Sequence, residues 1–582
     1  MVRGSRRLRD HHAGTVDANF PLPEWLRGYR RADLGGDAVA GVVVAIMLVP
    51  QAMAYAQLAG LPPEAGLYAS MAPLVVYALL GTSRTLAVGP VAIDSLLVAA
   101  GLAPLVAAGG DAVELALTLA LLVGAIDLVL GLARLGFLAN FLSHPVMSGF
   151  TTAAVLVIAL SQAKHLLGVP IEGMPSSHEL VLELVRRAPD TNLVTLAIGL
   201  GTVVLLLLFR YGVRAWLVRL GVRSGLAQLL GRSGPLVALV AGTLVARGLA
   251  LDSAAGVRVV GAIPTGLPHP TLPELETARA LLPTALAICL VGFLEAYSTG
   301  RALASKRRQK LDATRELVAL GGANVAAAFT GGYPVTGGLA RSTVNFAAGA
   351  NTPLASILTA LLVAVVVAFL TPLLHSLPQA VLAAIIVVAL TNLVDLRALR
   401  HVWRYSKADG LAMTVTFATS LVFPVQWGIL VGTTIALLLY LWRTSQPHVA
   451  VLGRVGTSEH FRNVRRHEVE TDPRILVLRV DENLYFPNAK FLEDTLLRAV
   501  ADRPEVRYVV LVCSAVSFVD TSALDTIERL DAELRDGGVV LLLSEVKGPV
   551  SDRLDRVGFL ERFGRDRVFL STHAAVTALE GA

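Results

Sequence analysis

The sequence predicts a polytopic α-helical membrane protein of about 14 transmembrane segments, followed by a small soluble α/β domain. Of its 582 residues, 54% are hydrophobic and only 16% are charged, which is more apolar than the core of a soluble protein requires. Apolar windows near twenty residues recur from Asp37 to about Trp442. Two of them are interrupted by glycine and proline, as in transporters with discontinuous helices.

The first apolar stretch, from Asp37 to Gly60, is too long for the hydrophobic region of a signal peptide. We therefore expect it to remain as a membrane helix. Basic residues cluster in the N-terminal tail and in the connections 210–232, 306–310 and 397–407. The positive-inside rule predicts that these regions, the N-terminus and the C-terminal domain are cytoplasmic in a multi-pass protein of the inner (plasma) membrane.

The net charge of +6 has a topological explanation, because the basic residues form short clusters and no extended basic face. The sequence therefore predicts lipid as a partner and no nucleic acid. Cys289 and Cys513 have no metal-ligand spacing, and we expect both as buried small side chains. We predict neither a metal nor a cofactor.

The pattern changes after Ser445. Short β-branched runs at 474–480, 507–512 and 539–543 alternate with helical spacing at 522–534, which predicts an α/β domain. This domain contains no GxGxxG, Walker A or HExxH motif, so nothing in it indicates a nucleotide site or an enzyme.

The two broken segments are Val88-Gly89-Pro90 and 331–338, GGYPVTGG. Backbone outside a helix cannot face lipid, because each unpaired amide there costs several kcal/mol, so such breaks line a cavity or are buried in protein. A helix can start at Pro90, with the proline in its first turn, and another after Gly337. If the two starts face each other, their free N–H groups form an anion site. The alternative is a pair of kinks between packed helices.

Two charged residues near these breaks are candidates for the chemistry. Arg341, in the first turn after the second break, is a candidate countercharge for the anion; alternatively it pairs with a carboxylate or extends to the cytoplasmic face. Glu295 lies in an apolar run where its neutral form is favoured, so it could carry a proton, or it could pair with Arg341. Thr299 lies one turn on. We interpret Asp94 and Asp127 as packing or interfacial carboxylates in preference to proton carriers.

Several motifs resemble the sulfate permease (SulP) family, relatives of the animal solute carrier family twenty-six. The C-terminal part is similar to the STAS domain (sulfate transporter and anti-sigma factor antagonist) that follows such transporters. The matching residues are VPQAMAYA (49–56), GLPPEAGLY (60–68), GTSR (81–84), VGP (88–90), GYPVTGG (332–338), Arg341-Ser342, Val344-Asn345, LYFPNA (484–489) and VDTSA (519–523).

The resemblance implies two inverted repeats of seven segments, split into a core domain and a gate domain that work by an elevator-like movement. The chain would then divide into a tail (1–34), a transport domain (35–445, with repeats 35–250 and 280–443), a linker (446–470) and a STAS domain (471–582). A homodimer is expected.

The resemblance also implies the residues that line the anion pocket, with Glu295 at the acidic position used for ion coupling. The lining residues carried over are Gln51, Tyr55, Val91, Ala92, Gly337, Gly338, Leu339, Ala340 and Arg341. Thr299 joins them as a hydrogen-bonding candidate.

Departures from the family pattern affect the coupling ion and the anion. Val91 and Leu339 replace the hydroxyl side chains of sodium-coupled relatives, which disfavours sodium and favours proton symport. Ala340 replaces a serine common in animal exchangers, so their anion preference cannot be transferred. Ser522 occupies the position phosphorylated in soluble anti-sigma antagonists, but Ala523 replaces a glycine usual there, and we favour a capping role for this segment over regulation.

The function predicted is secondary active transport of a small inorganic or carboxylated anion, with sulfate as the leading candidate. The STAS domain is expected to regulate the transporter or to stabilise its trafficking and assembly. Bicarbonate and C4-dicarboxylates are the alternative substrates. An uncoupled channel would conduct without a coupled proton and tolerate Glu295→Gln. A membrane-anchored sensor would bind ligand without flux.

Overall fold

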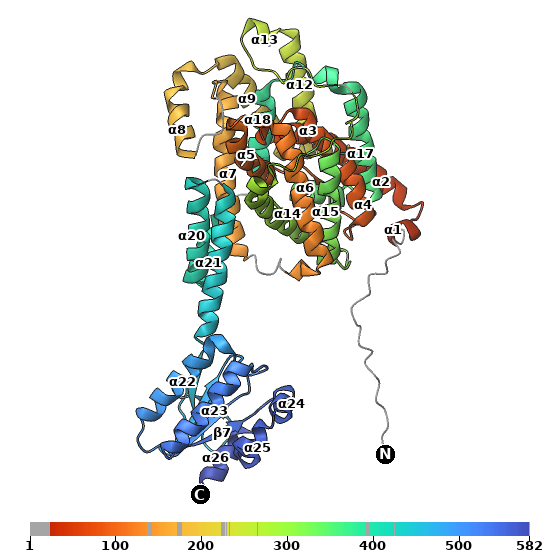
Figure 1. Cartoon of the computed structure of the whole chain (residues 1–582). Coiled ribbons are helices and arrows are strands. Elements are labelled where there is room, and N and C mark those ends of the chain that lie inside the picture. Colours follow the sequence, from red (N-terminus) through yellow and green to blue (C-terminus); the bar gives the residue numbers. More distant parts are fainter. Residues whose placement is uncertain are drawn as a thin grey trace. The chain divides into compact units, whose positions relative to one another are not determined.

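The computed structural model describes residues 24–137, 143–171, 177–222, 227, 230–231, 233–264, 266–391, 396–423 and 425–580. The chain forms two compact units with a boundary between Ile435 and Ala436 (Figure 1). The N-terminal unit is almost entirely helical, whereas the C-terminal unit is built on a six-stranded sheet. We describe each unit by itself.

The first half of the N-terminal unit contains one short strand, β1 (Val88–Gly89), among its helices. The helices are α1 (Glu24–Arg27), α2 (Asp33–Leu58), α3 (Pro63–Tyr68), α4 (Ala72–Leu80), α5 (Ala92–Ala107), α6 (Ala112–Leu132), α7 (His144–Leu167), α8 (Ser177–Arg186), α9 (Leu193–Leu208), α10 (Arg214–Arg219), α12 (Gly234–Gly248) and α13 (Leu251–Ala254).

The second half likewise contains one short strand, β2 (Thr336–Gly337). Its helices are α14 (Ala278–Lys306), α15 (Ala313–Phe329), α16 (Leu339–Ala347), α17 (Leu354–Val365), α18 (Gln379–Leu390), α19 (Leu396–Tyr405), α20 (Lys407–Val422) and α21 (Val425–Ser445), the last of which runs across the boundary.

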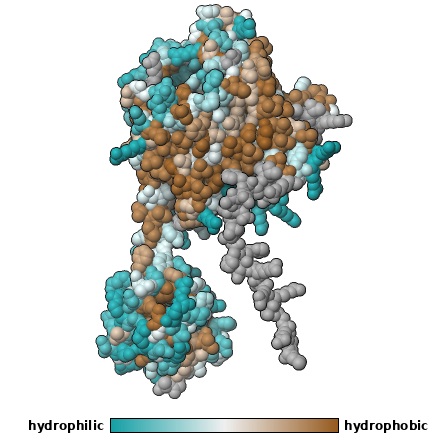
Figure 2. Space-filling view, turned by 45° about the vertical axis from the view of Figure 1, so that its right-hand side comes forward, coloured by the Kyte–Doolittle hydropathy of each residue, from teal (hydrophilic) through white to brown (hydrophobic). Residues whose placement is uncertain are grey.

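Eight helical segments within the described ranges are long and apolar enough to cross a membrane. Three shorter apolar helices, α5, α12 and α18, have 10–17 residues. Figure 2 shows the corresponding surface, where hydrophobic residues cover most of the visible face of the helical unit. A polytopic membrane protein is therefore confirmed, while the total of 14 segments stays a prediction.

The two broken segments meet in the interior of this unit. β1 pairs antiparallel with β2, with Val88 opposite Gly337 and Gly89 opposite Thr336. Around this pair, α15 packs on α6 and α4, and α14 packs on α5, α6 and β2 (Figure 1). The backbone freed from helix is thus paired and buried in protein, as the cost of an unpaired amide in lipid demands.

The C-terminal unit confirms the predicted α/β domain. Its sheet has the order β4-β3-β5-β6-β7-β8, with β5 to β8 parallel and β3 antiparallel to both its neighbours. The strands are β3 (Val449–Arg454), β4 (Phe461–Asn463), β5 (Ile475–Val480), β6 (Tyr508–Val512), β7 (Val540–Ser544) and β8 (Val568–Phe569).

Helices cover both faces of this sheet. The larger core cluster joins the sheet to α22 (Phe486–Ala501), α23 (Thr521–Asp536), α24 (Gly548–Arg556) and α25 (Phe559–Phe563). The smaller cluster joins it to α26 (Thr572–Glu580). Because both faces are covered, β5, β6 and β7 read as continuous apolar runs in the sequence.

The segment 446–470 differs from the expected linker, because it contains β3 and β4. β3 pairs with β5 through four residues, from Val449 opposite Val480 to Leu452 opposite Val477. The physical reason is that β3 covers an otherwise open edge of the parallel sheet. Three of its six side chains are only partly buried, so its hydrophobic signal is weaker than the continuous apolar runs of the central strands.

Candidate functional site

The first helix start is the beginning of α5. Val91 is its N-cap residue, in an extended conformation with φ −130°, and the helix begins at Ala92. Pro90 therefore precedes the N-cap and does not lie in the first turn, which corrects the sequence-based expectation. Gly89 has φ +147°, a conformation that glycine adopts readily and other residues avoid.

The second helix start is the beginning of α16, with Gly338 as N-cap and Leu339 as the first helical residue. Neither Val91 nor Gly338 contributes a capping side chain, so the first-turn amides of both helices lack the usual side-chain acceptor. Hydrogen bonds tie the two segments together: the Ala87 amide donates to Ser342 Oγ (2.9 Å), and Asn345 Nδ2 donates to the Thr85 carbonyl (3.0 Å).

A cavity of about 580 Å³ opens at these helix starts. It is also lined by residues of α2, α9, α12, α14 and α18. Two of the predicted pocket residues, Thr299 and Gly337, are buried but do not line the cavity. The other predicted residues are brought together around it: Gln51, Tyr55, Val91, Ala92, Glu295, Gly338, Leu339, Ala340 and Arg341.

Arg341 is the buried cation of this cavity, with only 2% of its surface exposed. Its Nη1 donates to the Pro90 carbonyl, whereas Nε and Nη2 have no hydrogen-bond partner in the described structure. A buried guanidinium with unpaired donors is costly unless a ligand supplies acceptors. The arrangement suits an oxyanion, whose oxygens match the planar donor geometry of arginine.

Glu295, half-buried on α14, lies in the same cavity. Of the ion pairs within the described ranges, none joins Glu295 to Arg341, so the alternative of a salt bridge between them is not realised in this structure. Glu295 interacts electrostatically with Arg341 and with the Leu339 amide at the start of α16. The carboxylate and an incoming anion would therefore share the same positive groups.

Two buried polar residues that sequence analysis missed hold the broken segments in place. The Glu316 carboxylate accepts hydrogen bonds from Tyr77 Oη (2.6 Å), Thr82 N (2.8 Å) and Oγ1 (2.5 Å), and Ser83 N (3.1 Å). Asn324 exchanges two hydrogen bonds with the backbone of Val335, at 2.8 and 3.1 Å. A carboxylate inside an apolar helix was the available signal for Glu316.

A third such residue is Asp37, in the first turn and a half of α2. It accepts from the amides of Asn351 (2.7 Å) and Thr352 (3.0 Å) and from Thr352 Oγ1 (2.6 Å). Asp37 thus holds a loop from the second half of the chain, while Glu316 holds a loop from the first half.

The two other carboxylates that stood out in apolar stretches of the sequence, Asp94 and Asp127, are both buried. Asp127 is 2% exposed and accepts a hydrogen bond from the Cys289 thiol at 2.9 Å. Asp94 is 1% exposed, and neither of its carboxyl oxygens has a partner in the described structure. Cys289 and Cys513 are both buried, as expected.

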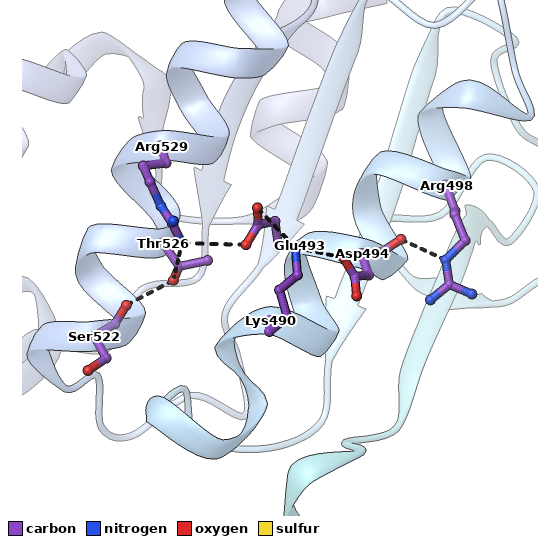
Figure 3. Close-up of polar contacts among 7 residues, drawn as sticks. All are labelled: Lys490, Glu493, Asp494, Arg498, Ser522, Thr526 and Arg529. Carbon is purple, nitrogen blue, oxygen red and sulfur yellow. Dashed lines mark hydrogen bonds and ion pairs between the residues drawn. The ribbon is translucent and has the colours of Figure 1, made fainter.

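Ser522 lies outside this site, exposed in the first turn of α23. The capping role falls on Asp520, whose carboxylate accepts from the amides of Ala523 and Phe486, both at 2.8 Å. Figure 3 shows the polar contacts nearby: Thr526 donates to the Ser522 carbonyl, and Arg529 reaches Thr526 and Glu493. A regulatory role for Ser522 stays a prediction.

Comparisons with known proteins identify the family of both units. Residues 34–416 match the model of the sulfate permease family, and residues 466–575 match that of the STAS domain. A protein described as probable sulfate transporter 4.2 of Arabidopsis thaliana is 36% identical over 96% of this chain and 83% of its own length. A probable sulfate transporter of Mycobacterium tuberculosis is 37% identical over 95% of this chain and 96% of its own length.

A solved structure with a similar fold is that of the murine Solute Carrier 26 family member A9 anion transporter in the inward-facing state. It has a TM-score of 0.88 and 25% sequence identity, covering 99% of this chain and 97% of the other. These matches are to transporters and not to enzymes, which confirms the prediction that the chain is a transporter and not an enzyme. The chain therefore belongs to the sulfate permease family, as a multi-pass membrane protein with a C-terminal STAS domain.

Proposed function

We propose that this protein is a secondary active transporter that takes up sulfate or a related small anion together with protons. The observation that carries the proposal is the buried Arg341 guanidinium, with Nε and Nη2 unpaired, in a cavity lined by the starts of α5 and α16. First-turn amides and a guanidinium form an anion site that needs no metal. The names of the Arabidopsis and Mycobacterium relatives favour sulfate as the anion.

Proton coupling follows from the position of Glu295. Its carboxylate and a bound anion compete for the field of Arg341 and the Leu339 amide. Anion binding therefore favours the protonated form of Glu295, and a proton on Glu295 favours anion binding, since such coupling is reciprocal. Because the Glu295 carboxyl group is open to the cavity, it can then release this proton, together with the anion, on the other side of the membrane.

The movement we propose is an elevator-type displacement of the paired breaks and their supporting helices. Glu316 of α15 holds the loop before the first break, and Asn324 of the same helix holds the second break. Asp37 of α2 holds the loop that follows α16. Such hydrogen bonds favour motion of the site as one body.

We further propose a homodimer in the plasma membrane with the N-terminus and STAS domain in the cytoplasm, in accord with the basic connections.

The test is uptake of radiolabelled sulfate into proteoliposomes under an inward proton gradient. We expect accumulation in the wild-type protein and its loss in Glu295→Gln, with Glu276→Gln in an exposed loop as the matched control. Bicarbonate and fumarate serve as competitors. Sulfate accumulation that persists in Glu295→Gln would exclude Glu295 as the residue that couples transport to protons. Absence of sulfate flux in correctly folded protein would exclude sulfate and direct attention to the competing anions.

A further inference from the structure

Asp94 is a buried carboxyl group that the proposed site does not use. It lies in the first turn of α5, directly behind the helix start that lines the cavity, and is 1% exposed. Both its oxygens lack a hydrogen-bond partner in the described structure. A buried carboxylate without donors pays its full desolvation cost, whereas a protonated carboxyl group does not carry that charge.

The position of Asp94 relative to Glu295 is set by a glycine. A Cβ atom built on Gly292 would lie 3.1 Å from Asp94 Oδ2, so the Asp94 carboxyl group packs directly on α14 at this residue. Gly292 and Glu295 are three positions apart on that helix and lie on the same face. Asp94 therefore packs on α14 one helical turn before Glu295, beside Thr336, at a position that carries no side chain.

The groups around Asp94 within the described ranges are mainly carboxyl, hydroxyl and thiol groups, with Arg341 as the buried cation. α5 packs on α2, α6, α7 and α14, and its neighbour Ser95 bonds to Tyr333 Oη at 3.1 Å. Glu295 and Asp127 act on Asp94 electrostatically. Lys164 and His165 of α7 line a separate cavity at the C-terminal half of α5. The titratable and charged groups facing this region are Tyr55 of α2, Asp127 of α6, Cys289 and Glu295 of α14, Tyr333 before β2, and Arg341 of α16.

Asp127 provides a comparison within the same protein. It is also a buried intramembrane carboxyl group, but the Cys289 thiol satisfies one of its oxygens. Arg341, the buried cation among the residues that line the cavity, already donates to the Pro90 carbonyl. Asp94 thus has neither the donor that Asp127 has nor a cation of its own. A proton is the remaining means of neutralising it.

We propose that Asp94 is a second proton-binding residue, filled through Glu295, so that two protons travel with each divalent anion. This inference rests on the proposed function. In the transfer, the O–H bond of the Glu295 carboxylic acid breaks and an O–H bond forms on the Asp94 carboxylate. Glu295 then takes a second proton from the cavity. Two protons balance the two charges of sulfate, so each transport cycle moves no net charge.

The experiment measures the sulfate accumulation ratio in proteoliposomes at a fixed pH difference, with the membrane potential clamped by potassium and valinomycin. Two protons per sulfate give ~100-fold accumulation per pH unit, independent of the potential. We expect this for wild type. Asp94→Asn should retain one proton, giving ~10-fold accumulation at zero potential and a ratio that falls when the inside is negative. Asp127→Asn is the matched control and should keep the wild-type ratio.

The outcomes separate this inference from the proposed function. If wild type accumulates no sulfate under any proton gradient, the proposed function fails. If wild type accumulates ~100-fold and Asp94→Asn does the same, Asp94 is not the second proton site. Wild-type accumulation of ~10-fold also overturns the inference, even when Asp94→Asn does not fold. Gly292→Ala, which places a methyl group against the Asp94 carboxyl group, should shift the ratio toward that of Asp94→Asn.

Discussion

The guanidinium of Arg341 donates a hydrogen bond to the carbonyl oxygen of Pro90, 251 positions earlier in the chain. This bond joins the second broken segment to the first and uses only one of the guanidinium nitrogens. The other two stay unpaired and buried at the cavity. The arginine is therefore held in place before an anion arrives, and preorganisation of this kind lowers the entropic cost of binding.

Replacing Arg341 by glutamine should abolish sulfate binding, because the buried countercharge and two donors are lost together. Arg341→Lys should recover little, since a single ammonium group cannot reach the Pro90 carbonyl and present a planar pair of donors. The measurement is the sulfate affinity of purified protein by calorimetry, where we expect at least a ~100-fold loss. Arg301→Gln, at an exposed position of α14, is the control. Unchanged affinity in Arg341→Gln would place the anion elsewhere.

Replacing Glu316 by glutamine should destabilise the loop that leads into the first broken segment. The carboxylate accepts four hydrogen bonds from Tyr77, Thr82 and Ser83, and an amide cannot accept all of them. We expect a loss of about 2 kcal/mol, seen as a lower thermal unfolding temperature in detergent. Tyr77→Phe removes one of these bonds and should have a smaller effect. Equal stability of wild type and Glu316→Gln would show that the carboxylate is dispensable.

Gly432→Ala should destabilise the contact between α20 and α21. A Cβ atom at Gly432 would lie 2.0 Å from Thr416 Oγ1, which itself is fixed by a bond to the Ala412 carbonyl (2.7 Å). We expect a loss of about 2 kcal/mol in thermal unfolding. Gly201→Ala is the matched helical control, because a Cβ there meets nothing within 4 Å. Since alanine favours helix, this control should be neutral or slightly stabilising, and equal behaviour of the two variants would contradict the packing.

Cys513 should resist alkylation in the folded protein at pH 8. Burial, assisted by the Glu545 carboxylate, raises the pKa of its thiol to about 12, so the reactive thiolate is scarce. The pKa of the Cys513 thiol in the folded state lies above the ordinary value near 8.5. The contribution of this thiol to folding stability is therefore fully present below about pH 8.5 and is lost as the pH rises toward 12. Peptide mass spectrometry after iodoacetamide treatment, with and without urea, measures the reactivity of this thiol, and thermal unfolding as a function of pH measures the change in stability. Rapid labelling without urea at pH 8 would contradict the burial of this thiol.

Much of the fold could be predicted because its signals are local. Apolar runs and basic connections indicated the membrane unit, and the continuous runs at 474–480, 507–512 and 539–543 correspond to β5, β6 and β7. β3 and β4 were missed because an edge-covering strand carries a weaker hydrophobic pattern than a central one. The place of β3 in the sheet depends on its pairing with β5.

For the site, the sequence by itself determined where the two helices break and which residues follow each break, because glycine, proline and helix starts act within a few residues. Arg341 and Glu295 stood out as charges in apolar surroundings. Only the tertiary structure decided that the breaks pair with each other, that Arg341 bonds to Pro90 and not to Glu295, and that the Asp94 oxygens are unpaired. The physical reason is that these contacts join residues up to 251 positions apart, so they depend on how whole helices pack and not on any local pattern.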